Sequence, residues 1–160
     1  MKSDLKIPNW IVHSKWAKKA GIDKFIADFV NRNIDYGTSW AFKDGDNEYY
    51  IEEYESVVAK QLNFFHQKDL EEEYNHKSYV KAYYLHHLLD FFKETRINIY
   101  QINAVFDQFL KEKIETETIN NEGNKVNFLK EIHQIFDFLR KNKEDLYSDL
   151  KGEYFTNYYE

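Results

Sequence analysis

The sequence of 160 residues contains no cysteine, one proline and five glycines. Without cysteine the chain has no disulfide, no thiolate metal ligand and no cysteine nucleophile. We therefore expect it to reside in the reducing cytoplasm. The scarcity of proline and glycine leaves long stretches without helix breakers, and this favours helices.

The chain also lacks long apolar runs and an excess of basic charge. Residues 1–10 (MKSDLKIPNW) have no apolar signal-peptide core, and no window approaches the roughly 18 apolar residues of a membrane span. We therefore expect neither secretion nor membrane insertion. The formal net charge is −6, and the acidic excess is concentrated in residues 44–73. Because nucleic-acid binding requires a basic surface, we expect no direct binding to nucleic acid.

Common catalytic motifs are absent as well. The sequence has no GxxxxGK[ST] phosphate loop, GxGxxG, GxSxG or HExxH motif, and no EF-hand loop. Kinase, P-loop, Rossmann, α/β-hydrolase and zincin functions therefore lose their main support.

What the chain does contain is an apolar content of 42% with residues recurring every three to four positions. We predict an all-α fold, a single-domain bundle of about six helices over residues 1–160. The expected helices span about 9–21, 23–34, 47–67, 78–95, 98–117 and 125–142, with Ser78 as a cap, a loop at 35–46 and a turn at 120–124. Residues 152–160 are expected to form a flexible or docking tail.

Histidine and carboxylate side chains share one face of the helix expected at 78–95. Tyr79, Tyr83, His86 and Asp90 lie at positions i, i+4, i+7 and i+11. A His and an Asp one turn apart can bind the same metal ion, and the tyrosine hydroxyls can donate to a phosphate. The alternative interpretation is an ordinary surface hydrogen bond beside a core-edge tyrosine.

His13 is expected on the apolar side of its helix, next to Trp16. An unpartnered buried imidazole costs on the order of 1–3 kcal/mol, so an inward His13 requires a carboxylate, a carbonyl or a metal ion. Asp35, just past the second expected helix, is a candidate to face the same space. His66 ends the third expected helix, where the alternative is a favourable contact with the helix dipole.

Several spaced His and Asp residues on successive helices resemble the HD-domain metal-dependent phosphohydrolases. The resemblance covers residues 13–90, with His13 as the early helix ligand, His66 as the His of the central pair and Asp90 as the late Asp. The family is named for an adjacent His-Asp pair. This chain has no such pair, because Gln67 follows His66. The resemblance therefore implies either a working enzyme or a degenerate, non-catalytic member of the family.

Two functions from different classes follow. The first is a metal-dependent hydrolase of a nucleotide or other small phosphoester, using Mn, Fe, Ni, Co or Zn. Its expected metal ligands are His13, His66, His86 and Asp90, its catalytic residues Asp35, His87 and Lys81, and its substrate contacts Tyr79 and Tyr83. The second is a non-enzymatic interaction or inhibitor protein, of the kind that mobile elements encode. Its acidic, tyrosine-rich residues 47–74 would bind a basic protein partner. A homo-oligomer with an aromatic ligand pocket is a third option.

Overall fold

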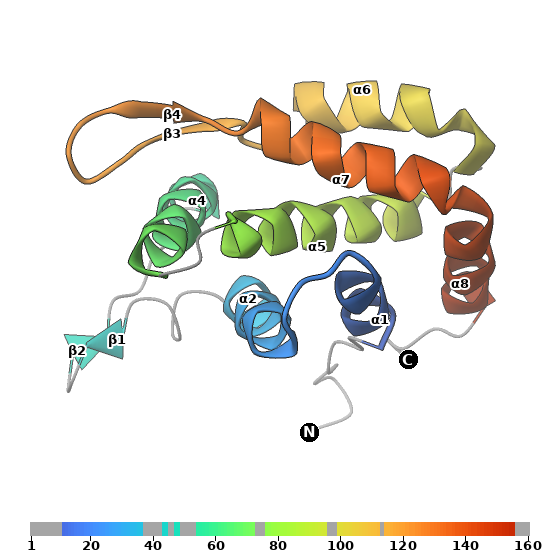
Figure 1. The fold of residues 1–160 in the computed structure, drawn as a ribbon, viewed down its shortest axis with the longest axis horizontal. Coiled ribbons are helices and arrows are strands. Elements are labelled where there is room, and N and C mark those ends of the chain that lie inside the picture. The colour runs from blue at the N-terminus through green and yellow to red at the C-terminus, as the bar shows by residue number, and fades with distance from the viewer. Residues whose placement is uncertain are drawn as a thin grey trace.

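The computed structural model describes residues 11–36, 43–44, 47–48, 54–72, 76–95, 99–112 and 114–155. The described residues form an all-α helical domain with two small hairpins (Figure 1). The helices are α1 (Ile11–Lys19), α2 (Lys24–Tyr36), α4 (Tyr54–Glu71), α5 (Ser78–Thr95), the 3₁₀ turn η2 (Ile99–Gln101), α6 (Ile102–Glu112), α7 (Leu129–Lys141) and α8 (Lys143–Phe155). The strands are β1 (Lys43–Asp44) with β2 (Asn47–Glu48), and β3 (Glu117–Ile119) with β4 (Lys125–Asn127).

Helix α5 is the central element of the fold. Helices α6 and α7 lie on one side of it, α1 and α2 lie on the other, and α4 and α8 stand at its two ends (Figure 1). Its apolar residues point in several directions, and Val80, Leu85, Leu88 and Phe92 are all buried. Because α5 is covered on most sides, any polar side chain in its middle needs a partner inside the protein.

The turn between α1 and α2 places these two helices side by side. Gly21 has a φ of +80°, the left-handed conformation that glycine adopts without strain. The amide of Ile22 donates to the carbonyl of Ala17, which ends α1 in a Schellman-type turn. The Asp23 carboxylate then accepts from the amide of Phe25 and caps α2, as its sequence predicts.

The first turn of α5 is capped from another helix. The carboxylate of Asp69, in α4, accepts hydrogen bonds from the amides of Tyr79 at 2.8 Å and Val80 at 2.9 Å. Ser78 was expected to cap this helix. That expectation is wrong, because Ser78 is the first residue of α5 and a cap residue precedes the helix. Asp69 therefore fixes where α5 begins relative to α4.

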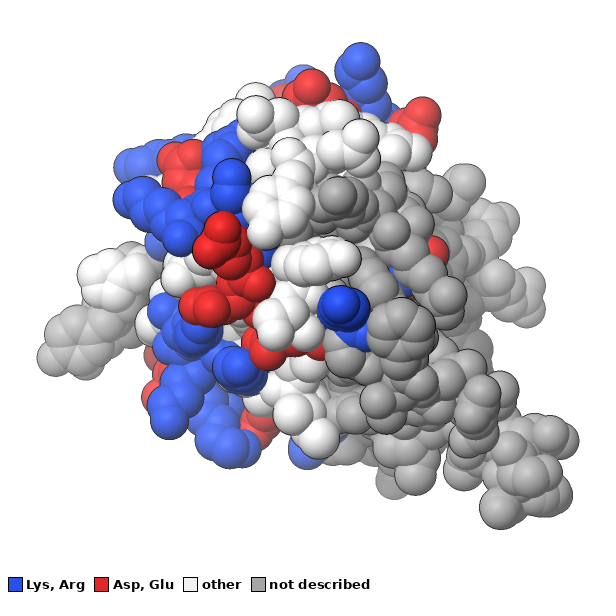
Figure 2. All heavy atoms as spheres, turned by 90° about the vertical axis from the view of Figure 1, so that its right-hand side faces the viewer, with Lys and Arg blue, Asp and Glu red and all other residues white. Residues whose placement is uncertain are grey.

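Helix α8 is fastened to α1 by hydrogen bonds and ion pairs. The buried indole of Trp16 donates to Asp149 at 2.8 Å, and Lys15 lies 2.8 Å from the same carboxylate. Lys19 forms a longer pair with Asp145 at 3.5 Å. On the face that carries α8, acidic side chains lie between groups of basic ones (Figure 2). This contact holds α1 in place.

The second hairpin shortens two of the expected helices. The helix expected at 98–117 ends at Glu112, and the one expected at 125–142 begins at Leu129. Between them β3 pairs antiparallel with β4 around the expected turn, where Gly123 has a φ of +85°. The β-branched residues of Glu117–Ile119 and Lys125–Asn127 favour this extended pairing over helix.

Other boundaries also differ from expectation. The helix expected from residue 47 begins at Tyr54, because Asn47–Glu48 pairs with Lys43–Asp44 in the first hairpin. Residues 152–155 of the expected tail belong to α8, and residues 156–160 lie outside the described part of the chain. Residues 49–53 and 73–74 of the acidic segment 47–74 likewise lie outside it. None of the described helices combines the length and apolar composition needed to cross a membrane.

Candidate metal centre

Side chains from α1 and α5 meet in the interior of the domain. His13 of α1 and His86 and Asp90 of α5 each offer one ligand atom, and these atoms lie within 4.8 Å of one another. His13 Nε2 is 2.9 Å from Asp90 Oδ1, and His86 Nε2 is 3.2 Å from Asp90 Oδ2. The expected face of α5 therefore supplies two members of a three-residue group, and the inward His13 supplies the third.

His86 is held on both ring nitrogens by residues of α2. Its Nδ1 lies 2.7 Å from Asn31 Oδ1, and its Nε2 lies 3.1 Å from Asp35 Oδ1. Burial alone would lower the pKa of His86, but the hydrogen bonds and charges of Asp35 and Asp90 raise it to about 9. In the metal-free protein His86 is therefore an imidazolium between two carboxylates.

His13 is in a different state from His86. Burial and the nearby charge of His86 lower its pKa, although Asp90 acts in the opposite direction. Its exposed fraction is 6%, and neither ring nitrogen has a hydrogen bond of good geometry among the described residues. The 2.9 Å contact with Asp90 thus joins a neutral imidazole and a carboxylate without satisfying the imidazole. An unsatisfied buried ring of this kind is costly unless another group occupies the site.

Asp90 is the residue shared by both histidines. Burial would raise its pKa, but the close side chains of His13 and His86 hold it well below its ordinary value. The Nζ of Lys93 lies 3.8 Å from Asp90 Oδ1 and adds a further positive charge. Asp90 therefore remains a carboxylate, the form in which it can ligate a metal ion.

Among the described residues of this group, the carboxylates are the members that reach solvent. The side chains of His86 and His13 are 1% and 6% exposed, whereas those of Asp35 and Asp90 are 19% and 27% exposed. Both carboxylates line a pocket of about 280 Å³, and His87 forms part of its wall. Burial and the charge of His86 lower the pKa of His87 to about 3, which makes it a neutral group and a weak base.

His66 does not belong to this group. Its ring packs at 5.3 Å from that of Phe128, near Lys77 and Glu131, and burial with the charge of Lys77 lowers its pKa. The expected ligand set of the HD-domain resemblance is therefore corrected at this position. The structure brings His13 and Asp90 together with His86. His66 lies elsewhere, because α4 directs it against Phe128 at the start of α7.

Three expected substrate or catalytic contacts also lie elsewhere. The Tyr79 hydroxyl donates to Glu72, and the buried Tyr83 ring packs among aromatic side chains that include Phe65. Lys81 precedes Asp90 by nine residues, about 13 Å along a helix. None of Tyr79, Tyr83 and Lys81 lines the pocket beside the histidines.

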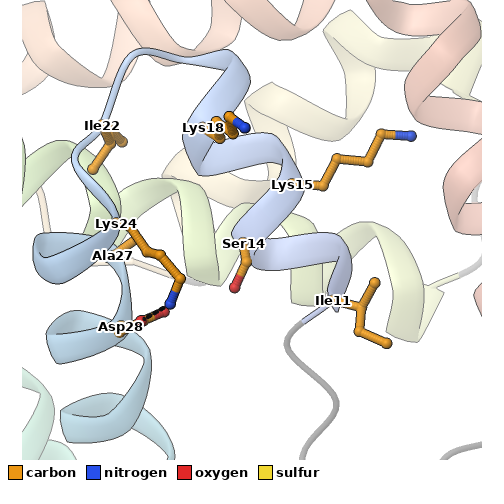
Figure 3. Close-up of a pocket in the computed structure, with 8 residues that line it drawn as sticks. All are labelled: Ile11, Ser14, Lys15, Lys18, Ile22, Lys24, Ala27 and Asp28. Atoms are coloured by element: carbon orange, nitrogen blue, oxygen red, sulfur yellow. Dashed lines mark hydrogen bonds and ion pairs between the residues drawn. The ribbon is translucent and has the colours of Figure 1, made fainter.

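A larger groove lies between α1 and α2, with a volume of about 800 Å³ (Figure 3). It is lined by Ile11, Ser14, Lys15, Lys18, Ile22, Lys24, Ala27 and Asp28. Lys24 and Asp28 pair with each other, and Lys15 pairs with Asp149. The carboxylate in this groove, that of Asp28, pairs with Lys24, and no histidine lines the groove, so we place the candidate chemistry in the smaller pocket.

Asn31 is the residue of the candidate site that sequence reasoning missed. It lies four positions before Asp35 on α2, so both residues face His86 from the same helix face. This i, i+4 spacing was the available signal. Comparison with protein-family models, with curated proteins and with solved structures finds no match to this chain.

Proposed function

We propose that this chain is a divalent-metal-dependent hydrolase of a phosphoester. The observation that carries the proposal is the convergence of His13, His86 and Asp90, with the neutral, unsatisfied His13 ring aimed at the carboxylate. Two imidazoles with one carboxylate form a donor set that suits Zn, Fe, Mn, Co or Ni better than Mg or Ca.

Two contacts of Asp90, one from each of its oxygens, support the same assignment, and the full spread of 4.8 Å means that the ligands draw closer together when an ion binds. Ligands bound at about 2.0–2.2 Å to one ion lie roughly 3–3.5 Å apart when they occupy adjacent positions. The contacts of Asp90 with His13 at 2.9 Å and with His86 at 3.2 Å are close to this spacing. Ordinary hydrogen bonds have similar lengths, but a hydrogen bond would satisfy His13, and here its ring remains unsatisfied.

Asn31 supports metal binding through His86. Its Oδ1 faces His86 Nδ1 at 2.7 Å and accepts a hydrogen bond from that N–H. The Nε2 lone pair is then directed toward Asp90 and His13. Histidine ligands of metal sites are commonly held in this way, by an acceptor on the second ring nitrogen.

Hydrolysis is supported by the position of Asp35. A bound divalent ion lowers the pKa of water and polarises a phosphoryl oxygen. Asp35 lies beside His86 on the pocket side, where its carboxylate can accept the proton that water loses as its oxygen bonds to phosphorus. The ester P–O bond then breaks and the alcohol leaves with a proton.

The experiment is metal loading of the full chain. The protein is stripped with a chelator, loaded with Mn, Fe, Co, Ni or Zn, and its metal content and phosphoester hydrolysis are measured. We expect about one ion per chain, and loss of that ion in His13→Ala, His86→Ala and Asp90→Ala. His133→Ala is the matched control, because His133 is exposed and lies four residues before Asp137. A chain that binds no stoichiometric metal overturns the proposal.

A further inference from the structure

Among the described residues that line the pocket beside the candidate metal centre, one side chain can donate a hydrogen bond. The polar side chains of this lining are the carboxylates of Asp35, Asp90 and Glu94 and the imidazole of His87. An ionised carboxylate accepts hydrogen bonds, whereas a histidine ring carries at least one N–H in either protonation state. A phosphoryl oxygen is an acceptor, so of these four groups His87 is the one that can donate to it.

Both ring nitrogens of His87 are without a hydrogen bond to the described part of the chain. Its Nε2 is buried, while the residue as a whole is partly exposed and forms part of the pocket lining. Nδ1 is therefore the ring nitrogen that a ligand in the pocket can reach. The preceding residue, His86, is different, because Asn31 and Asp35 contact its two ring nitrogens. His87 thus retains a hydrogen-bonding capacity that the fold does not use.

The ring of His87 is held in place by neighbouring rings of α5. The Tyr83 ring, one helical turn earlier, meets it edge to face, with 4.7 Å between the ring centroids. The His86 ring lies 5.6 Å away in a similar edge-to-face arrangement. A donor that is already fixed loses little entropy when a ligand binds, and its hydrogen bond is more effective for that reason.

His87 lies next to the carboxylate of the candidate metal centre. It precedes Asp90 by three residues on α5, and side chains with this spacing are neighbours, with Cβ atoms about 5–6 Å apart. Both residues line the same pocket of about 280 Å³. A phosphoryl group that the proposed metal ion holds beside Asp90 is therefore within reach of the His87 ring.

We infer that His87 binds the substrate by donating a hydrogen bond from its ring N–H to a non-bridging oxygen of the phosphoryl group. This inference rests on the proposed phosphoester hydrolysis. The hydrogen bond positions the phosphoryl group near Asp35 and stabilises the negative charge of its oxygens. His87 keeps its proton throughout, so the bonds that form and break are those of the proposed hydrolysis. It takes the role of substrate contact that the sequence predicted for Tyr79 and Tyr83.

The first experiment measures binding of inorganic phosphate to the metal-loaded full chain. His87→Phe keeps a ring of similar shape and removes the N–H. We expect the dissociation constant of phosphate to rise about 10- to 100-fold, the usual effect of losing one hydrogen bond to a charged group, with the metal content unchanged. His87→Asn keeps an N–H at the position of Nδ1 and should restore most of the affinity. His133→Phe, on the exposed face of α7, is the matched control and should bind phosphate like wild type.

A measurement on the wild-type chain does not depend on these variants. Zinc has no unpaired electrons, so the ring nitrogen resonances of the Zn-loaded chain can be followed by nuclear magnetic resonance while inorganic phosphate is added. We expect phosphate to shift the resonances of His87 and to leave those of the exposed His133 unchanged. Phosphate binding without a shift at His87 overturns the inference.

Hydrolysis of para-nitrophenyl phosphate distinguishes the inference from the proposed function. We expect His87→Phe to lower kcat/KM about as much as it weakens phosphate binding, and His87→Asn to recover most of the loss. If the metal-loaded wild type cleaves the ester and His87→Phe does so equally well, the role of His87 is overturned and the proposed hydrolase stands. Loss of the metal from His87→Phe also overturns this role, because His87 is then a ligand. If the wild type binds no metal or cleaves no phosphoester, the proposed function falls and the inference falls with it.

Discussion

His13 on α1 and Asp90 on α5 bring an imidazole nitrogen and a carboxylate oxygen to 2.9 Å inside the domain. The two residues are far apart in the sequence, and the packing of α1 against α5 creates the contact. The same contact joins the N-terminal helix to the central helix. Residues that hold α1, α2 and α5 in register should therefore affect metal binding as well as stability.

The metal-free chain should lose stability in mild alkali. The pKa of His86 is raised from 6.5 to about 9 by Asp35 and Asp90, so the folded state binds this proton more tightly than the unfolded state. The resulting stabilisation is fully present below about pH 6.5 and is lost as the pH rises through about 9. We expect a loss on the order of 3 kcal/mol over this window.

Urea unfolding of the chelator-treated chain at several pH values measures this loss. In His86→Gln, which cannot take up the proton, the dependence over this window should be absent. A wild-type free energy of unfolding that stays constant from pH 6.5 to 9.5 contradicts the assigned imidazolium.

Asn31 should control metal affinity without touching the metal. Asn31→Ala removes the acceptor for His86 Nδ1, and we expect metal affinity to fall about 10- to 100-fold. Asn31→Asp keeps an acceptor at the same position and should retain most of the affinity. Competition with a chelating dye measures both variants, and Asn103→Ala, on the exposed face of α6, is the control. Equal affinities for Asn31→Ala and wild type would remove Asn31 from the site.

The hydrogen bond between Trp16 and Asp149 should contribute more to the free energy of unfolding than the neighbouring ion pair of Lys19 and Asp145. Asp149→Ala leaves the buried indole N–H without its acceptor, and we expect a loss of about 1–3 kcal/mol in the free energy of unfolding. Asp145→Ala is the matched control on the same helix. It breaks the 3.5 Å pair with Lys19. The Asp145 side chain is 72% exposed, so the change should cost less than about 1 kcal/mol.

Asp149→Ala should also weaken metal binding several-fold, because His13 lies one turn before Trp16 on α1. Measuring both metal affinity and urea denaturation of each variant separates the effect on metal binding from the effect on stability. If Asp149→Ala and Asp145→Ala lower the free energy of unfolding equally, the Trp16–Asp149 hydrogen bond is not the main interaction that holds α1 against α8.

Asp69 should be important for stability rather than for chemistry. Asp69→Ala leaves the amides of Tyr79 and Val80 unpaired in a buried place, and we expect a loss of about 2–3 kcal/mol. Asp69→Asn keeps one acceptor oxygen and should lose less. Urea denaturation measures the series, with Asp107→Ala on the exposed face of α6 as the control. A loss in Asp69→Ala no larger than in the control contradicts the capping role.

Part of the candidate site follows from local sequence alone. The i, i+4 spacing of His86 and Asp90 places them on one helix face, and the apolar neighbours of His13 predict that it points inward. The helix at Ser78–Thr95 was predicted to within one residue at its start and with the same end. These predictions succeed because helical periodicity depends on neighbours within about one turn.

Other features needed the tertiary structure. The sequence suggests His66 as readily as His86, since each is a histidine on an apolar helix, but α4 directs His66 against Phe128. The two hairpins were missed because short strands gain their stability from pairing partners that a local pattern does not reveal.

The sequence by itself therefore determined an all-α chain and the helix faces that carry its histidines and carboxylates. Only the packing of α1 and α2 on α5 decided that His13 meets Asp90 and that Asn31 and Asp35 face His86. The physical reason is that helix formation is governed by contacts close in sequence. The convergence of side chains from separate helices depends on how those helices pack across a shared core.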